Sequence, residues 1–195
     1  MSKKCYRFFG GLLNTQEKWL NKMSEKGYRL VRTGKLLYEF EKCKPDEVTY
    51  CVEFIGEKSK ESSIDYANFL EDMGYKVFFK NINLNYSVGK GRWRPWAERG
   101  GRIATNTTTF NREILTVEKA NDGKPFELHT SYDDKEKYYR NLRNPWLFLL
   151  LMFALFAVTK QSIIFGIFAL VSVIPGSIYQ IQIMKIRKEA KTQEW

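Results

Sequence analysis

The chain has 195 residues and a formal net charge of +10, because 32 lysines and arginines outnumber 22 aspartates and glutamates. Its length suits one domain of ordinary size with a small appendage. The 15% aromatic content excludes a disordered chain, the three cysteines exclude a disulfide scaffold, and the apolar residues gathered between Pro145 and Met184 exclude a purely soluble basic protein.

The first part of the chain has the pattern of an α+β domain. Residues 4–9 predict a strand, and Asn14 with Glu17 has the spacing of a capping box that opens a helix over 15–26. Gly27 is a natural C-cap for that helix. Alternation and turn residues then predict strands over 28–32, 36–41, 49–55 and 76–80, with a second helix over 63–73.

Two short segments with similar sequences lie at the ends of the two predicted helices. The segments MSEKGYRLV and LEDMGYKVF both run from a helix through Gly-Tyr into a basic and then an aliphatic residue. Two such helix-to-strand units predict a ferredoxin-like antiparallel sheet with helices on one face. Helix capping by Gly-Tyr explains the similarity of the two segments without an ancestral repeat. The predicted fold class is α+β in either case.

The segment 80–103, KNINLNYSVGKGRWRPWAERGGRI, carries most of the basic excess of the first 144 residues. It holds six basic residues against Glu98 alone. Two arginines on one side of an extended chain can grip phosphates bidentately, and two tryptophans can stack or insert among lipid headgroups. The candidate binding residues are Lys90, Arg92, Trp93, Arg94, Trp96, Arg99 and Arg102.

Three interpretations of this basic segment compete. It can seat the domain on an anionic lipid leaflet, bind an anionic or nucleotide-like ligand near Gly89 and Gly91, or form a structural Trp-Arg ladder over a sheet face. Lipid contact and the structural ladder are favoured equally over a ligand loop. Charge alone allows nucleic acid, but a membrane tether and a mixed surface elsewhere disfavour it.

Beyond this segment, residues 114–119 and 126–130 flank Asn121-Asp122-Gly123, which predicts a β-hairpin. Ser131 with Asp134 then predicts a capping box and a helix that leads towards the apolar region.

Catalytic and metal-binding patterns are scarce. His129 is the sole histidine, so a multi-histidine metal site is excluded, and its setting is that of a strand end. Cys43 and Cys51 do not have zinc-ligand spacing, and Gly89-Lys90-Gly91 does not match a phosphate-binding P-loop. The sequence therefore predicts no catalytic residue, no metal and no cofactor, and an enzyme is the less favoured class.

Two apolar runs predict a transmembrane hairpin. Residues 146–158 carry no charge, and residues 163–184 form a run of 22 uncharged residues. At 1.5 Å per residue the second run extends about 33 Å, enough to cross a hydrocarbon core of about 30 Å. We expect a domain over 1–140, a hairpin over 141–184 with spans of about 143–159 and 163–184, and a basic tail over 185–195.

Basic residues flank the hairpin on the side of both termini, whereas the short loop between the helices offers only Lys160. The positive-inside rule therefore predicts a multi-pass cell-membrane protein with both termini in the cytoplasm. The first residues contain no apolar core long enough for a secretory signal, and the cysteines are expected to be reduced. The expected interface residues are Tyr138, Tyr139, Arg143, Trp146 and Lys160.

Small residues recur along one face of the second apolar run, at Gly166, Ala169, Ser172 and Gly176. Such a face permits close packing within the hairpin or self-association into a homo-oligomer, and a rigid anchor is the favoured interpretation. Pro175 predicts a kink. No ionisable residue lies inside either span, which disfavours a proton or ion pathway.

The segments CYRFFGGLLNTQEKWLNKMSEKGYRLVRTGKLLYEFE, NINLNYSVGKGRWRPW and NDGKPFELHT resemble a family of Gram-positive bacterial membrane proteins that is known as a domain of unknown function. The resemblance covers residues 4 to about 145, and RWRPW is its most specific part. It implies a cytoplasmic domain followed by transmembrane helices. It also implies frequent association with PadR-like transcriptional regulators and membrane-stress or drug-response circuits.

Two functions follow as hypotheses. The favoured one is a membrane-anchored cytoplasmic sensing or interaction module, with a protein partner or a PadR-like regulator circuit. The alternative is a membrane-tethered enzyme that acts on an anionic lipid headgroup or a nucleotide through the Arg/Trp segment.

Overall fold

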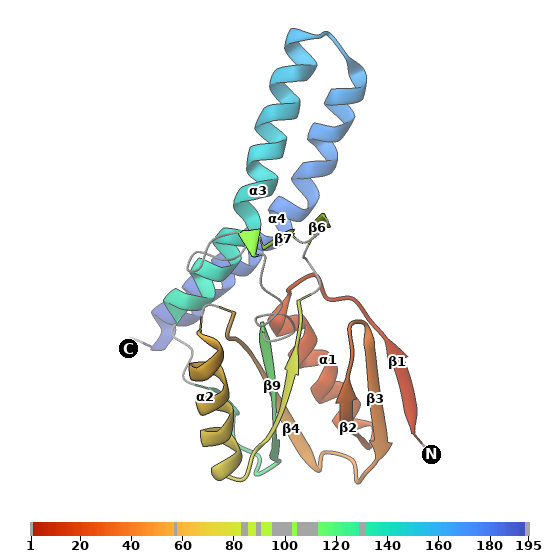
Figure 1. Cartoon of the computed structure of the whole chain (residues 1–195), viewed down its shortest axis with the longest axis vertical. Coiled ribbons are helices and arrows are strands. Elements are labelled where there is room, and N and C mark those ends of the chain that lie inside the picture. Colours follow the sequence, from red (N-terminus) through yellow and green to blue (C-terminus); the bar gives the residue numbers. More distant parts are fainter. Residues whose placement is uncertain are drawn as a thin grey trace. The chain divides into compact units, whose positions relative to one another are not determined.

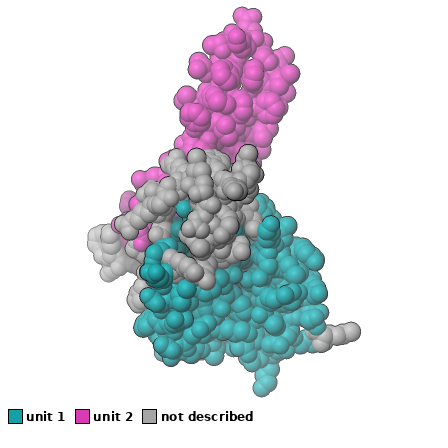
Figure 2. Space-filling view, viewed as in Figure 1, with its two compact units in different colours: residues 1–94, 98–129 teal, residues 95–97, 130–195 magenta. Residues whose placement is uncertain are grey.

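The computed structural model describes residues 2–56, 58–82, 86–88, 91–94, 103–104, 113–128 and 132–193. The chain divides into two compact units, one of residues 1–94 and 98–129 and the other of residues 95–97 and 130–195 (Figure 2). The first unit mixes helices and strands, and the second contains a pair of long apolar helices. The predicted α+β class followed by a two-helix hairpin is therefore confirmed.

The strands of the first unit form small antiparallel sheets in place of one continuous sheet. One sheet has the order β1-β3-β2, from β1 (Lys3–Tyr6), β2 (Tyr28–Thr33) and β3 (Leu37–Lys42). A second has the order β4-β9-β5, from β4 (Val48–Phe54), β5 (Lys76–Lys80) and β9 (Ile114–Ala120). Short strands β6 (Tyr86–Val88), β7 (Gly91–Trp93) and β8 (Ile103–Ala104) form a third sheet in the order β6-β7-β8.

Strand β9 is the centre of its sheet, and this position corrects the predicted hairpin. Both of its edges are occupied, because β4 pairs along one side and β5 along the other. Residues 125–128 form no strand. The Asn121-Asp122-Gly123 turn exists, since Gly123 has a φ of +72° and donates its N–H to Asn121 Oδ1 at 3.0 Å, but it does not lead into a paired strand.

The helices α1 (Leu13–Glu25) and α2 (Lys60–Asp72) end as the sequence predicts and start differently. Gly27 follows α1 with a φ of +74°, and a Cβ there would lie 2.9 Å from Cys43 O, so glycine is required. The capping box at Asn14 is wrong, because Leu12 is the N-cap residue and makes no side-chain cap. Glu17 instead accepts a hydrogen bond from the Val52 N–H of β4 at 2.9 Å.

Helix α1 contacts strands of both larger sheets, β2 and β4, whereas α2 contacts β5 (Figure 1). Trp19 of α1 packs edge-on against Tyr38 and Phe40 of β3, with ring centroids 5.0 and 5.6 Å apart. Leu70 of α2 lies in a buried cluster with residues of the β4-β9-β5 sheet and its flanks, namely Ile55, Leu115 and Val117. The similarity of the two Gly-Tyr segments has a structural basis, because each Gly-Tyr joins a helix to the strand that follows it, α1 to β2 and α2 to β5.

A buried polar network joins the two larger sheets. The Glu118 carboxylate of β9 accepts hydrogen bonds from Arg29 Nε of β2 at 2.7 Å and from the Tyr50 hydroxyl of β4 at 2.8 Å. The same Tyr50 hydroxyl accepts the Leu30 N–H at 2.7 Å. The Glu118 side chain is 2% exposed, so its charge depends on Arg29 for neutralisation.

The second unit is a hairpin of α3 (Tyr132–Thr159) and α4 (Ile163–Gln193), which run side by side and both bend part-way along (Figure 1). A Cβ added to Gly176 would lie 3.8 Å from Trp146 Cβ, so Pro175 and Pro145 occupy the same level of the hairpin. Each proline lacks the N–H that would bond four residues back, which accounts for matched bends.

The face of α4 that contains the predicted small residues packs inside the hairpin. Its buried positions recur at alternating spacings of three and four, as knobs-into-holes packing against α3 requires. They are Ala169, Ser172, Gly176, Tyr179, Ile183 and Ile186. The basic tail predicted from residue 185 continues α4 as a helix to Gln193.

Candidate functional site

The structure describes the backbone of part of the predicted basic segment. Arg92 and Trp93 lie in β7, where Arg92 is opposite Ser87 and Ala104 and Trp93 is opposite Tyr86 and Ile103. The predicted extended conformation is therefore present at the centre of the segment. The candidates Lys90, Trp96, Arg99 and Arg102 lie outside the described residues, as does His129.

Arg94 is buried, whereas a residue that binds phosphate at the surface would be exposed. Its side chain is 6% exposed, although the sequence presents it as the symmetrical partner of Arg92. Burial of an arginine stem and guanidinium is typical of a structural contact. Arg94 is therefore buried in the structure, and the choice between lipid contact, a ligand loop and a structural ladder stays a prediction.

Lys80, the first basic residue of the segment, is also buried. It is 5% exposed, and its Nζ donates hydrogen bonds to the carbonyl oxygens of Gly34 at 2.5 Å and Lys35 at 2.7 Å. The same Nζ lies 4.5 Å from the ring centroid of Tyr38. Burial lowers the pKa of Lys80 from 10.5 to about 8. The lowered pKa makes Lys80 the most perturbed cation of the described segment.

A small cavity adjoins Lys80 and Tyr38. It holds about 10 Å³, which suits a single water molecule. Tyr38 is fully buried, and its hydroxyl makes no hydrogen bond within the described part of the chain; burial raises its pKa above the ordinary value. The cavity is too small for a substrate, and beside it the Lys80 ammonium contacts the Tyr38 ring.

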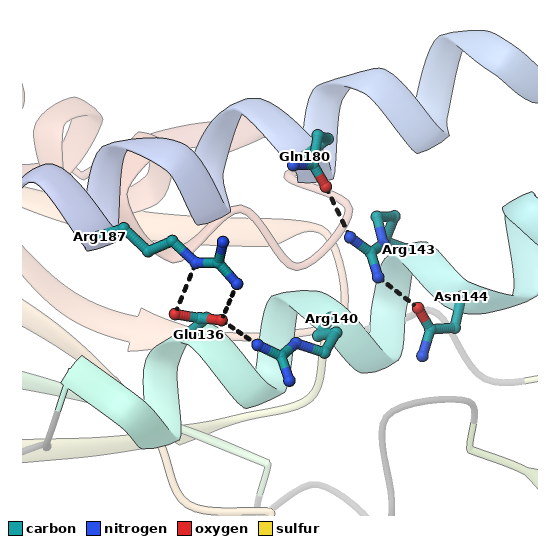
Figure 3. A network of polar contacts seen from close by, with 6 residues as sticks. All are labelled: Glu136, Arg140, Arg143, Asn144, Gln180 and Arg187. Carbon is teal, nitrogen blue, oxygen red and sulfur yellow. Dashed lines mark hydrogen bonds and ion pairs between the residues drawn. The ribbon is translucent and has the colours of Figure 1, made fainter.

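In the hairpin, Glu136 of α3 is a hub for two arginines (Figure 3). Arg187 of α4 donates through Nε at 3.0 Å and Nη2 at 2.7 Å, and Arg140, one turn along α3, forms an ion pair with the same carboxylate. The Glu136–Arg140 spacing of four residues is a recognisable helical pair. The contact with Arg187, which is far along the chain, has no comparable signal in the sequence.

Arg143 lies further along α3 and has a different environment (Figure 3). Its Nη1 donates to Gln180 Oε1 of α4 at 2.6 Å, and its Nη2 donates to Asn144 Oδ1 at 2.9 Å. Its Nε is buried and has no hydrogen-bond partner among the described residues. Arg143 is thus held by neutral carboxamides, whereas Arg140 and Arg187 are held by a carboxylate.

The other predicted interface residues are divided between the interior and the surface. Tyr138 and Tyr139 are 2% and 1% exposed, and their rings contact each other at 5.0 Å between centroids. Trp146 is half-buried beside Gly176, and Lys160 is exposed in the turn between α3 and α4. Arg143 is joined to α4 by its hydrogen bond to Gln180.

The outer surface of the hairpin is apolar. Leu151, Val158, Ile163 and Leu170 are between 71% and 82% exposed. Both helices are long and apolar enough to cross a membrane, judged by length and composition. Within the described residues, no group of three or more His, Cys, Asp and Glu side chains is arranged to hold a metal ion.

These features define an α+β protein with two membrane-length helices at its C-terminal side. The chain belongs to the family described as a protein of unknown function (DUF2812), whose model matches residues 13–151. The match runs from the start of α1 to the middle of α3, so it includes the α+β unit and part of the hairpin. Searches of curated proteins and of solved structures found no match.

Proposed function

We propose that the protein is a membrane-anchored interaction module. The hairpin of α3 and α4 spans the membrane, both termini lie in the cytoplasm, and the α+β unit binds a partner at the membrane surface. The chain resembles proteins associated with PadR-like regulators. In this proposal its partner therefore belongs to a regulatory circuit that responds to membrane stress or drugs.

The exposed apolar surface of the hairpin carries this proposal. A soluble monomer rarely exposes a contiguous apolar patch of more than a few hundred Å². The hairpin exposes long apolar side chains along both helices, including Phe148, Leu155, Ile164 and Ile174. A hydrocarbon environment removes the cost of that exposure, and the internal hydrogen bonds of the helices satisfy their backbones there.

A binding role for the α+β unit is supported by the edge of its first sheet. Strand β1 pairs with β3 on one side and forms a sheet edge on the other. Tyr6, at the end of β1, is 73% exposed, and Phe8 beside it is 60% exposed. Exposed aromatic residues at a sheet edge are typical of surfaces that receive another chain.

Cysteine labelling tests the membrane orientation. We expect Gln161→Cys, in the turn between the helices, to react in intact cells with a maleimide that does not cross membranes. Native Cys5 should react with this maleimide only after the cells are permeabilised. Gln161 has a φ of +48°, and cysteine keeps a Cβ there, so the replacement adds no new backbone strain. Labelling of Cys5 in intact cells would refute the orientation, and recovery of the chain in the soluble fraction would refute the anchor.

A second experiment separates a binding module from the alternative enzyme. The full chain with Arg92→Ala or Trp93→Ala is compared with the wild type for capture of a protein partner and for turnover of lipid headgroups or nucleotides. Loss of the partner without turnover supports the module, and turnover lost on Arg92→Ala supports the enzyme. Arg92 is a better probe than Arg94, because the buried Arg94 side chain contributes to packing.

A further inference from the structure

An apolar groove runs along the hairpin between α3 and α4 at the level of the two prolines. Its volume is about 480 Å³, which is in the usual range for a bound small molecule. Leu147 and Leu150 line it from α3, and Val173 and Met184 line it from α4. Ser177, which is exposed and lines the groove, leaves this space open, because a larger side chain there would enter it.

Arg143 provides the charge of this groove. Arg143 and Gln180 are both lining residues, and the lining contains no carboxylate. The guanidinium donates through Nη1 and Nη2 to the neutral amides of Gln180 and Asn144, and each of these nitrogens carries a second N–H that can bind an anion. An arginine in this state binds a phosphate or carboxylate strongly, because charge-assisted hydrogen bonds are about twice as strong as neutral ones.

We propose that this groove binds an anionic phospholipid, with the phosphate on Arg143 and an acyl chain along Leu147, Leu150 and Val173. The two halves of the site require an amphiphilic anion, which is the chemistry of this class of lipid. Arg143 directly precedes the uncharged part of α3, so its guanidinium is level with the headgroups when the hairpin spans a membrane. The inference rests on the proposed membrane location.

A second copy of the chain is a poorer occupant on the same evidence. Two hairpins in one orientation that met through this groove would bring Arg143 to the same depth as its counterpart. No carboxylate of the groove would separate the two guanidinium groups, so like charges would face each other in an apolar environment. A lipid phosphate neutralises the arginine instead.

The test is native mass spectrometry of the full chain in detergent with phosphatidylglycerol or the zwitterionic phosphatidylcholine. We expect the wild type to retain phosphatidylglycerol preferentially and Arg143→Gln to weaken this retention at least about tenfold. Lys185→Gln is the matched charge control, since Lys185 is exposed on α4 and does not line the groove. Arg143→Lys should restore part of the preference.

Two tryptophan substitutions on α4, one inside the groove and one outside it, test whether lipid occupies the groove. Ser177→Trp fills the groove from an exposed position and should weaken retention of both lipids, whereas Leu170→Trp, on the exposed surface of the same helix, should not. Equal retention by Arg143→Gln and Lys185→Gln, or a second copy retained in place of lipid, overturns the lipid site.

Alkaline extraction of membranes distinguishes this failure from failure of the proposed function. If wild type and Arg143→Gln both stay in the membrane pellet while lipid retention shows no preference, the lipid site alone is wrong. If the wild-type chain is released into the supernatant, the membrane anchor itself is wrong.

Discussion

Lys80 illustrates how one buried cation is tolerated in this fold. Its ammonium reaches two consecutive carbonyl oxygens, those of Gly34 and Lys35, in the turn after β2. The Tyr38 ring lies beside the same ammonium. These contacts replace part of the lost hydration, but the charged form still costs free energy, because burial disfavours it.

This cost predicts a dependence of stability on pH. Between pH 8 and 10.5 the unfolded chain keeps the Lys80 proton while the folded chain releases it, so the free energy of unfolding rises with pH in that window. Relative to Lys80→Met, which does not titrate, the wild type should gain up to about 3 kcal/mol across the window. The measurement is urea unfolding of the full chain in detergent micelles, followed by tryptophan fluorescence at several pH values.

The exposed Lys76 on the same strand provides the control, since Lys76→Met removes a lysine from β5 without emptying the buried site. Its stability profile should run parallel to that of the wild type. Parallel profiles for Lys80→Met and the wild type would instead show that the two carbonyls hold the lysine in its charged form throughout.

At the scale of elements, α1 protects the free edge of β4. Asn21 donates its Nδ2–H to Tyr50 O at 3.0 Å and accepts the Tyr50 N–H through Oδ1 at 2.7 Å. Ser24 donates to Val48 O at 2.5 Å, and Glu17 accepts the Val52 N–H. Side chains of a helix thus occupy the places that a neighbouring strand would take, which prevents edge-to-edge association of this sheet.

Replacing Asn21 tests this arrangement. Asn21→Ala leaves the Tyr50 N–H and C=O groups without their partners, and we expect a loss of about 1–3 kcal/mol in the free energy of unfolding. Asn14→Ala, on the same helix, is the matched control and should be nearly neutral, since the helix has no side-chain cap. Urea unfolding measures both. A large effect at Asn14 together with none at Asn21 would restore the capping box and refute the edge contact.

The same helix shows which features can be predicted from the sequence. Its end at Gly27 is a local matter of backbone conformation, so the glycine predicts it. The role of Glu17 depends on a strand 35 residues further along, and local spacing assigns it to a capping box instead. The hairpin predicted after β9 is wrong for a related reason, because the turn is local but the choice of β4 and β5 as partners is not.

The candidate sites also combine features that local sequence predicts with features that depend on tertiary contacts. The apolar runs predict the hairpin, and the spacing of three and four predicts its packed face. The basic character of residues 80–103 is evident in the sequence, yet the burial of Lys80 and Arg94 depends on tertiary contacts that composition does not express. The neutral partners of Arg143 come from Gln180 on the other helix, so the groove is a property of the folded hairpin.

At the scale of the whole molecule, the proposed arrangement surrounds the α+β unit with water and the hairpin with lipid. The α+β unit has its own buried clusters, a polar network between its sheets and a helix along the edge of β4. The hairpin has an apolar exterior and a packed seam of small and aromatic residues. Each unit therefore holds the interactions that its own environment requires.

This division predicts that the α+β unit folds without the hairpin. A fragment of residues 1–129 should remain in the supernatant after high-speed centrifugation and unfold cooperatively in urea, because the helices and strands of this unit pair and pack among themselves. The full chain should stay with membranes under the same fractionation. Carrying Arg29→Met into the fragment is the control: it leaves the buried Glu118 carboxylate without its cation and should lower the urea midpoint. A fragment that aggregates, or that shows no cooperative transition even as wild type, would mean that the hairpin supplies part of the folding free energy of the α+β unit, and that the two units form one cooperative structure.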